Sequence, residues 1–557
     1  MRVLGIEGTA WCASAALHDA EADTTVIESD PYEPDSGGIH PREAAEHMTE
    51  AIPRVVDRVL DHAEAEYGPD AVDAIAFSRG PGLGPCLRTV GTAARALAGT
   101  LDVPLVGVNH MVAHLEIGRH ESGFENPVCL NASGANAHLL GYHDGRYRVL
   151  GETMDAGVGN AIDKFTRHVG WSHPGGPKVE AAAAEFADTE PTESDLLDLP
   201  YVVKGMDFSF SGISSAANDA YDDGVPVEET CFALQEHVFA MLTEVSERAL
   251  SLTGADELVL GGGVGQNDRL REMLATMCGD RGAEFYAPDP KYLRDNAGMI
   301  AVLGAKMARA GDTLPIRESA VDPNFRPDQV PVTWRENAPS VTRTGRADAP
   351  GRASTTEPER RGAEAVVDVL PDRVIKRRVP KSYRHPELDR TLRVERTVSE
   401  ARLTSEARRA GVPTPLVYDV DVANATLTLQ RVGDRDLAAA LTPRRAAAVG
   451  RHLARLHDAG IVHGDPTTRN VRARGETHDE PLDGGDPAVQ LIDFGLGYHS
   501  GHVEDHAMDL HVFEGSVVAT AADPDPIVEA FEDGYRSIAA ADAIERLRDV
   551  ETRGRYR

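Results

Sequence analysis

Short apolar runs alternate with longer amphipathic segments through the first part of the chain. Runs such as residues 2–8, 72–80 and 256–263 have the length of buried strands and end in turns that contain glycine. Segment 47–67 repeats its apolar side chains every three or four residues, which predicts an amphipathic helix. This alternation predicts an α/β domain over residues 1–325.

The pattern changes after this domain. Residues 326–362 are rich in Pro, Ser, Thr, Gly and charge, and hold few large apolar side chains, which predicts a flexible linker. Residues 363–557 begin with strand-like runs and continue mainly as helical patterns, which predicts a small bilobal α+β domain. Within it, segment 474–488 has the composition of an acidic surface loop.

No run of 18 apolar residues occurs, so we expect no membrane span, and the first residues start a strand rather than a signal peptide. The five cysteines are scattered and form no C-x-x-C, which is typical of reduced thiols in a cytoplasmic protein. These features predict a cytoplasmic location without a membrane partner.

Charge adds information about the environment. The chain holds 90 acidic and 57 basic residues, a net charge of −33, and only seven of the basic residues are lysines. An acid-rich, lysine-poor composition indicates a salt-loaded cytoplasm, because screening by salt makes the self-repulsion tolerable. We therefore expect a halophile, in which any nucleic acid would have to bind a local basic patch.

Two histidines, His110 and His114, follow the strand-like run 103–109. At a spacing of four residues they share one helix face, with Cβ atoms about 5–6 Å apart, and can bind one metal ion. Asp295 precedes an apolar helix and is either a helix N-cap or a third ligand. A His–His–Asp set suits zinc or iron and leaves positions open for a substrate.

Four turns after predicted strands are unusually rich in glycine, within residues 5–10, 78–97, 131–140 and 259–270. Glycine allows backbone N–H groups to approach phosphate oxygens closely, and a helix N-terminus adds a favourable dipole. One such turn has an ordinary steric explanation. Four in one domain predict a nucleotide held in a cleft.

The first domain resembles the universal tRNA threonylcarbamoyladenosine transferase family, which has a two-lobed actin–hexokinase-like fold. The resemblance rests on "GPGLGPCLR", "NHMVAH", "SGAN", "GETMDAGVGNAIDKF", "HPGGPKVE", "KGMDFSFSG", "GGGVGQN" and "DNAGMIA". It implies that His110, His114 and Asp295 bind one divalent metal, with iron favoured over zinc. The residues that it implies for the nucleotide or adenylate are Asn131, Ala132, Ser133, Gly134, Ala135, Asp163, Gly176, Glu180 and Asn267.

The resemblance also implies the reaction. The threonylcarbamoyl group of threonylcarbamoyl-AMP would pass to N6 of the adenosine next to the anticodon in ANN-decoding tRNAs, and AMP would leave. Archaeal and eukaryotic members usually carry a metal-contacting Tyr where this chain has Asn131. The sequence leaves open whether the amide oxygen of Asn131 takes that place.

Two strings in the second domain, residues 461–471 and 489–497, carry the spacing of a kinase site. Asp465 is placed to accept a hydroxyl proton, Asn470 follows five residues later, and Asp493 opens a D-F-G. Lys376 is expected to anchor ATP phosphates. Glu400 is preferred over Glu395 as its partner, because its surroundings have the stronger helical pattern.

The second domain resembles the small atypical serine/threonine kinase that accompanies the transferase in the KEOPS complex, through "GAEA", "KSYRHPELD", "ERTVSEARL", "HGDPTTRN" and "DFGLG". The chain as a whole resembles the bifunctional archaeal fusion of the two. This implies ATP and magnesium as cofactors, an ATPase or autokinase that regulates the transferase, and further KEOPS subunits as partners. The basic stretch 373–396, with Tyr383 within it, and the tail 554–557 are candidate tRNA contacts.

Two other functions are weighed against this one. A metalloprotease is opposed by the missing Glu of H-E-x-x-H, because Met111, Val112 and Ala113 stand between the two histidines. A small-molecule kinase of the actin–hexokinase type, regulated by the second domain, shares the fold. The histidine pair opposes it, since phosphotransfer in such kinases uses magnesium and carboxylates.

Overall fold

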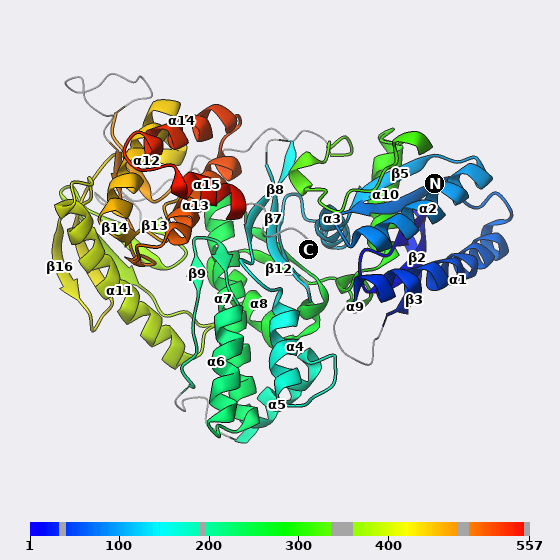
Figure 1. The fold of residues 1–557 in the computed structure, drawn as a ribbon, viewed down its shortest axis with the longest axis horizontal. Helices are drawn as coiled ribbons and strands as arrows, with labels where there is room; N and C mark the ends of the chain where they lie inside the picture. The colour runs from blue at the N-terminus through cyan, green and yellow to red at the C-terminus, as the bar shows by residue number, and fades with distance from the viewer. Residues whose placement is uncertain are drawn as a thin grey trace, which may run out of the picture.

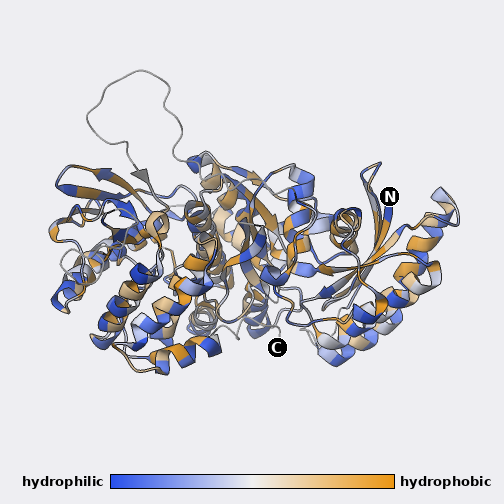
Figure 2. Cartoon of the chain, turned by 90° about the horizontal axis from the view of Figure 1, so that it is seen from above, coloured by the Kyte–Doolittle hydropathy of each residue, from blue (hydrophilic) through white to orange (hydrophobic). Residues whose placement is uncertain are grey.

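The computed structural model describes residues 1–32, 40–134, 136–143, 145–189, 196–335, 360–475 and 489–550. Three parts follow one another in space, from the blue N-terminal lobe through a cyan and green middle lobe to the yellow and red C-terminal domain (Figure 1). Strands and inward helix faces are mostly hydrophobic, and outer helix faces are mostly hydrophilic (Figure 2).

The N-terminal lobe is built on a five-stranded sheet of order β3-β2-β1-β4-β5. Strands β1, β2 and β3 are antiparallel, and β1, β4 and β5 are parallel. Leu4 and Ile6 pack with helices α1 and α2, whereas Val3 packs on the opposite face with α10. Both faces are thus covered, which explains the continuous apolar run of β1. The bounds are β1 Arg2–Glu7, β2 Cys12–Asp19, β3 Thr24–Pro31, α1 Pro41–Tyr67, β4 Ala74–Gly80, α2 Gly84–Leu101, β5 Leu105–Asn109 and α10 Ala297–Arg309.

The middle lobe repeats this topology. Its sheet has the order β12-β11-β6-β7-β8, with β6, β7 and β8 antiparallel and β6, β11 and β12 parallel. Helix α3 follows β5 and packs against strands of both sheets. The bounds are α3 His110–Ser122, β6 Val128–Ala132, β7 Ala137–His143, β8 Arg146–Glu152, α4 Val158–His168, α5 Gly176–Thr189, β9 Val203–Lys204, β10 Asp207–Phe208, α6 Ser211–Asp222, α7 Val227–Thr253, β11 Glu257–Gly261, η1 Gly263–Gln266, α8 Asp268–Arg281, β12 Glu284–Tyr286 and α9 Pro290–Leu293.

Two lobes of the same topology with α3 between them form the two-lobed α/β architecture expected for the first domain. The five cysteines are buried and unpaired, as their scatter predicts. No helix within the described ranges combines the length and apolar character needed to cross a membrane.

The first residues assigned to the linker belong to the first domain. Val330 is buried, the Trp334 ring stacks on Tyr147, and the Arg335 guanidinium lies 3.8 Å from the centre of the Tyr142 ring. The predicted start of the linker at residue 326 is therefore wrong, because aromatic and cation–π contacts fix residues 326–335. Residues 336–359 lie outside the described ranges. Two short helices precede residue 336, η2 Ile316–Glu318 and η3 Pro327–Gln329.

The C-terminal domain starts with an antiparallel sheet of order β13-β14-β15-β17-β16, against which α11 packs. A mainly helical part follows, with its own apolar core around Phe494, Phe513 and Phe531. The bounds are β13 Arg360–Arg361, β14 Ala365–Val369, β15 Arg373–Arg378, α11 Pro386–Arg409, β16 Val417–Asp421, β17 Thr426–Gln430, β18 Arg435–Asp436, η4 Leu437–Ala440, α12 Pro443–Asp458, β19 Ile461–Val462, β20 Val471–Ala473, β21 Val489–Leu491, β22 Tyr498–His499, α13 Val503–Thr520, α14 Asp525–Arg536 and α15 Asp542–Val550. Residues 476–488 of the predicted acidic loop lie outside the described part of the chain.

Candidate functional sites

The structure brings His110, His114 and Asp295 together between the two lobes. Asn109 caps α3 by accepting a hydrogen bond from the backbone N–H of Val112 (3.1 Å), so both histidines lie in the first turns of the helix. Asp295 Oδ1 lies 3.2 Å from His114 Nε2 and 3.4 Å from His110 Nε2. Asn296, not Asp295, caps the following helix α10. The carboxylate of Asp295 is therefore free to face the imidazoles.

Glu7 is a further member of this site that the sequence analysis did not single out. It is fully buried at the end of β1, and its Oε2 lies 3.2 Å from His110 Nδ1. Its other oxygen accepts the backbone N–H of Thr9 at 2.8 Å, and Ser78 donates its hydroxyl to Glu7. A carboxylate behind a metal-binding histidine fixes its tautomer and aims the second nitrogen at the metal. The available signal was an acidic residue inside an apolar strand.

The charges of the site are strongly coupled. Burial opposes the charged form of His110, but the carboxylates of Glu7 and Asp295 raise the pKa of His110 to about 10. Burial lowers the pKa of His114. Burial would raise the pKa of Asp295, but the two histidines hold that pKa well below its usual value. Two imidazoles and one ionised carboxylate thus converge within 4.8 Å of one another.

This donor set fits a divalent first-row metal, which takes imidazole and carboxylate ligands. The amide oxygen of Asn131 is buried without a hydrogen-bond partner, and it occupies space that a Cβ at Gly262 would need. His138, the cross-strand neighbour of Asn131, is buried with neither ring nitrogen hydrogen-bonded to protein. These polar atoms without protein partners make the region beside the histidines suitable for a polar ligand.

Replacing Glu7 by Gln is expected to weaken metal binding by about 10–100-fold, because the amide no longer supports the His110 Nδ1–H donor as a carboxylate does. Isothermal titration with Zn²⁺ measures this change. Asp207→Asn is the matched control: Asp207 is also buried, its pKa is raised by burial, and its acceptor contact to the Glu152 N–H can be kept by the amide. Equal affinities for wild type and Glu7→Gln would contradict the positioning role.

The residues assigned to the nucleotide lie around the ends of neighbouring elements in the middle lobe. Gly134 O accepts the N–H of Asn160 at the start of α4, and Ser133 O accepts that of Gly159. Asn131 and Ala132 are buried in β6, and Ala135 lies outside the described residues. The structure thus places the 131–134 segment against the N-terminus of α4, where its carbonyls accept two of the first N–H groups of the helix.

Two further contacts join the remaining members of this set. Asp163 accepts the N–H of Gly175 at 2.8 Å, just before Gly176 opens α5. Glu180 on α5 accepts the N–H of Asp268 at 2.9 Å, next to Asn267, which caps α8. The set therefore forms a connected group at the beginnings of α4, α5 and α8.

The second constellation assembles in the C-terminal domain. Lys376 on β15 forms a buried ion pair with Glu400 on α11, with Nζ–Oε distances of 3.0 and 2.9 Å, and Nζ lies 2.6 Å from Asp493 Oδ1. Glu400 rather than Glu395 is thus the partner of Lys376. Asp493 has a φ of +66°, a conformation that Asp and Asn adopt more readily than most residues. Asn470 Nδ2 donates to Asp465 Oδ2 at 2.9 Å.

The first domain reaches into this constellation through α7. Arg248 Nη1 lies 2.8 Å from Asp465 Oδ2, and the same guanidinium pairs with Glu364. Burial raises the pKa of Asp465 to about 7, although Arg248 acts in the opposite direction. The backbone N–H of Gly205 also donates to Gly464 O, next to Asp465, at 2.8 Å. Local sequence patterns do not show these contacts, because the partners lie more than 100 residues apart along the chain.

Three basic side chains of the stretch 373–396, those of Lys381, Arg384 and Arg396, pair with acidic residues of α7 in the same interface. Lys381 Nζ lies 2.6 Å from Glu247 Oε1, and Arg384 lies 2.6 Å from Glu244 Oε2. Tyr383 is 2% exposed. The expectation that Tyr383 contacts tRNA is therefore wrong, because its ring is buried in the interface, where its hydroxyl contacts Glu247. The tail 554–557 lies outside the described residues.

The fold and the convergence of His110, His114 and Asp295 define a two-lobed α/β protein with a candidate metal site between its lobes. Residues 23–302 match the TsaD family model, described as tRNA N6-adenosine threonylcarbamoyltransferase. The chain belongs to this family, as its motifs predicted.

Relatives match along the whole chain. A protein of Haloquadratum walsbyi is 65% identical over 558 residues, covering 100% of both chains. One of Halobacterium salinarum is 66% identical over 559 residues, covering 100% of this chain and 99% of its own. One of Methanospirillum hungatei is 50% identical over 556 residues, with the same coverage. All three are described as probable bifunctional tRNA threonylcarbamoyladenosine biosynthesis proteins.

Proposed function

We propose that this protein transfers the threonylcarbamoyl group from threonylcarbamoyl-AMP to N6 of the adenosine next to the anticodon in ANN-decoding tRNAs. The observation that carries this proposal is the convergence of His110, His114 and Asp295 beside the nucleotide-type group of the middle lobe, in a chain of this family. The amine nitrogen of the adenosine forms a new bond to the carbamoyl carbon. The bond between that carbon and the phosphate oxygen breaks, so AMP leaves, and the amine loses one proton.

The roles of the residues follow from their positions. His110, His114 and Asp295 would hold a divalent metal, with iron favoured, which supplies charge neutralisation for the developing negative charge of the leaving phosphate. Glu7 orients His110. The 131–134 segment and the starts of α4, α5 and α8 would hold the adenylate, with the positive end of the α4 dipole facing its phosphate. No side-chain nucleophile is needed, since the tRNA amine attacks directly.

AMP release tests this proposal. We expect release from threonylcarbamoyl-AMP to depend on an ANN-decoding tRNA and to fall to the tRNA-free rate when the adenosine beside the anticodon is replaced by guanosine. Release that is the same with both tRNAs would overturn the acceptor assignment. A small-molecule kinase would be favoured instead if the full-length Asp493→Asn variant, whose second domain lacks its D-F-G carboxylate, still phosphorylated a small molecule and released ADP from ATP.

For the C-terminal domain we propose a small atypical kinase or ATPase that uses ATP and magnesium and regulates the transferase within the KEOPS complex. The Lys376–Glu400 pair and the position of Asp493 next to Lys376 support phosphate binding. The contact between Arg248 and Asp465 supports coupling, because a residue of the transferase domain occupies the carboxylate that would accept a hydroxyl proton.

Replacing Arg248 by Ala is expected to raise autophosphorylation about tenfold, because one charge-assisted hydrogen bond no longer holds Asp465 away from a hydroxyl substrate. Since Arg248 lowers the pKa of Asp465, the assay should be run well above pH 7, where the carboxylate stays ionised without it. Incorporation of ³²P from labelled ATP measures the change.

Arg269→Ala is the matched control for this variant. Arg269 also pairs with an acidic residue of α7, Glu236, at 2.7 Å, but its carboxylate partners all belong to the first domain. We expect no change in phosphorylation from this control. An unchanged or lower rate for folded Arg248→Ala would contradict regulation through Asp465.

A further inference from the structure

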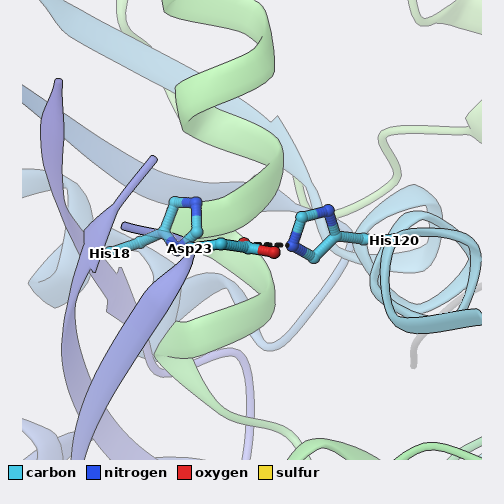
Figure 3. A group of neighbouring side chains, drawn as sticks. All are labelled: His18, Asp23 and His120. Atoms are coloured by element: carbon cyan, nitrogen blue, oxygen red, sulfur yellow. Dashed lines mark hydrogen bonds and ion pairs between the residues drawn. The ribbon is translucent and has the colours of Figure 1, made fainter. Parts of the chain in front are cut away.

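A second group of metal-type side chains lies in the N-terminal lobe, apart from the site between the lobes. It consists of His18 on β2, Asp23 in the turn between β2 and β3, and His120 in the last turn of α3 (Figure 3). One ligand atom of each residue lies within 4.8 Å of those of the other two. Three separate chain positions thus present two imidazoles and a carboxylate to one point.

The geometry of this group is well defined. His120 Nε2 lies 2.8 Å from Asp23 Oδ1, and the Asp23 carboxylate points at the His120 ring in Figure 3. The rings of His18 and His120 are perpendicular, with centroids 5.9 Å apart. His18 is 3% exposed, and its Nδ1 is hydrogen-bonded to the Thr25 hydroxyl at 3.0 Å. This bond fixes the ring and leaves Nε2 for another partner, as in oriented metal ligands.

The backbone also contributes to the arrangement. Asp23 has a φ of +54°, a left-handed conformation that few residues other than Gly, Asn and Asp adopt readily. This turn carries the carboxylate across to α3, where it meets His120. Asp23 therefore both closes the β2–β3 turn and contacts a side chain of the neighbouring helix α3.

We propose that His18, Asp23 and His120 form a second binding site for a divalent transition metal such as Zn²⁺, Ni²⁺ or Co²⁺. Imidazole and carboxylate donors suit these ions, and water can complete their coordination because Asp23 is 67% exposed. His114 and His120 are six residues apart on α3, about 9 Å along the helix axis, so the two sites are distinct.

The charges around His18 agree with a metal ligand. Burial, together with the neighbouring His120, lowers the pKa of His18 to about 4, so its ring carries no competing proton near neutral pH. Arg309 is the nearby cation, and its guanidinium is hydrogen-bonded to the Ala20 carbonyl at 2.8 Å rather than to Asp23. Without a metal the group would be only an ion pair between Asp23 and His120 with a ring packed beside it.

The site would have a structural consequence for the catalytic region. A metal bound there would fasten the β2–β3 hairpin to the end of α3, the same helix that presents His110 and His114. Binding of a ligand to the folded state alone stabilises that state. We therefore expect added Zn²⁺ to raise the melting temperature beyond the effect of filling the first site.

Titration of the full-length protein with Co²⁺ tests the proposal, followed by the visible d–d bands of the bound ion. Wild type should bind two equivalents of Co²⁺. The single variant His120→Ala and the double variant His110→Ala/His114→Ala should each bind one. The triple variant should bind none, and loss of His120 should weaken the second site more than about 100-fold. If the double variant does not fold, the difference in bound Co²⁺ between wild type and His120→Ala is sufficient to test the second site.

His168→Ala is the matched control. His168 pairs with Asp222 at 2.8 Å and packs edge-on against Tyr221, so it repeats the ion pair and ring contact without a second imidazole. This variant should retain two equivalents. The same stoichiometry for wild type and His120→Ala would overturn the second site.

Discussion

Replacing both His110 and His114 by Ala is expected to abolish threonylcarbamoyl transfer, with a loss of more than about 10³-fold. The two histidines are two of the three side chains that converge on the proposed metal position, and Asp295 cannot hold the ion alone. A metal ion contributes several kcal/mol of charge stabilisation in such reactions, which corresponds to this loss in rate. Label from radioactive threonine in tRNA, measured in molar KCl, reports the result.

The control for this experiment is His47→Ala, a histidine at the outer edge of the N-terminal lobe that contacts Asp30. It should keep both transfer and metal content. Metal content, measured by plasma mass spectrometry, separates two causes of inactivity in the double variant. Transfer that survives in a double variant that holds one equivalent of metal less than wild type would reduce the histidines to a structural role.

Replacing Asp493 by Asn is expected to lower ATP hydrolysis and autophosphorylation at least about 100-fold. The carboxylate lies 2.6 Å from Lys376 Nζ, and in kinases this Asp holds the magnesium that neutralises the phosphates. Asn accepts the left-handed backbone at this position, so the change removes charge without demanding a new fold. Release of phosphate from ATP measures the effect.

Asp372→Asn is the comparison, since Asp372 lies in the exposed turn between β14 and β15, where its carboxylate pairs with the neighbouring Arg373. It should hydrolyse ATP like wild type. The metal content of the first domain should be the same in both variants. Retained hydrolysis in Asp493→Asn would remove the basis for a kinase-type site.

Much of the fold could be predicted because local patterns decide it. Buried strands followed by glycine turns marked the sheets, and the spacing of His110 and His114 required one helix face. The pairing of Lys376 with Glu400 followed from the helical pattern around that glutamate. In each case the relevant signal lay within one element or its immediate neighbours.

The remaining features depend on contacts between distant segments. Glu7 meets His110 only because β1, β4 and β5 are adjacent in the sheet; an acidic residue in an apolar strand signals a buried carboxylate but does not identify its partner. Arg248 meets Asp465 because α7 packs against the C-terminal domain at the interface between the domains. A basic stretch gave the wrong expectation at Tyr383, since composition does not show whether charges face solvent or a buried acidic helix.

The most direct test of the central claim is nucleoside analysis of an ANN-decoding tRNA after reaction. The wild-type chain is incubated with threonylcarbamoyl-AMP-generating enzyme, the remaining complex subunits and unmodified tRNA in molar KCl, and the digested tRNA is examined by mass spectrometry. We predict N6-threonylcarbamoyladenosine, at the adenosine beside the anticodon, only when this chain is present. Unmodified adenosine at that position would contradict this function, provided that the same components modify the tRNA when a relative of this family replaces this chain.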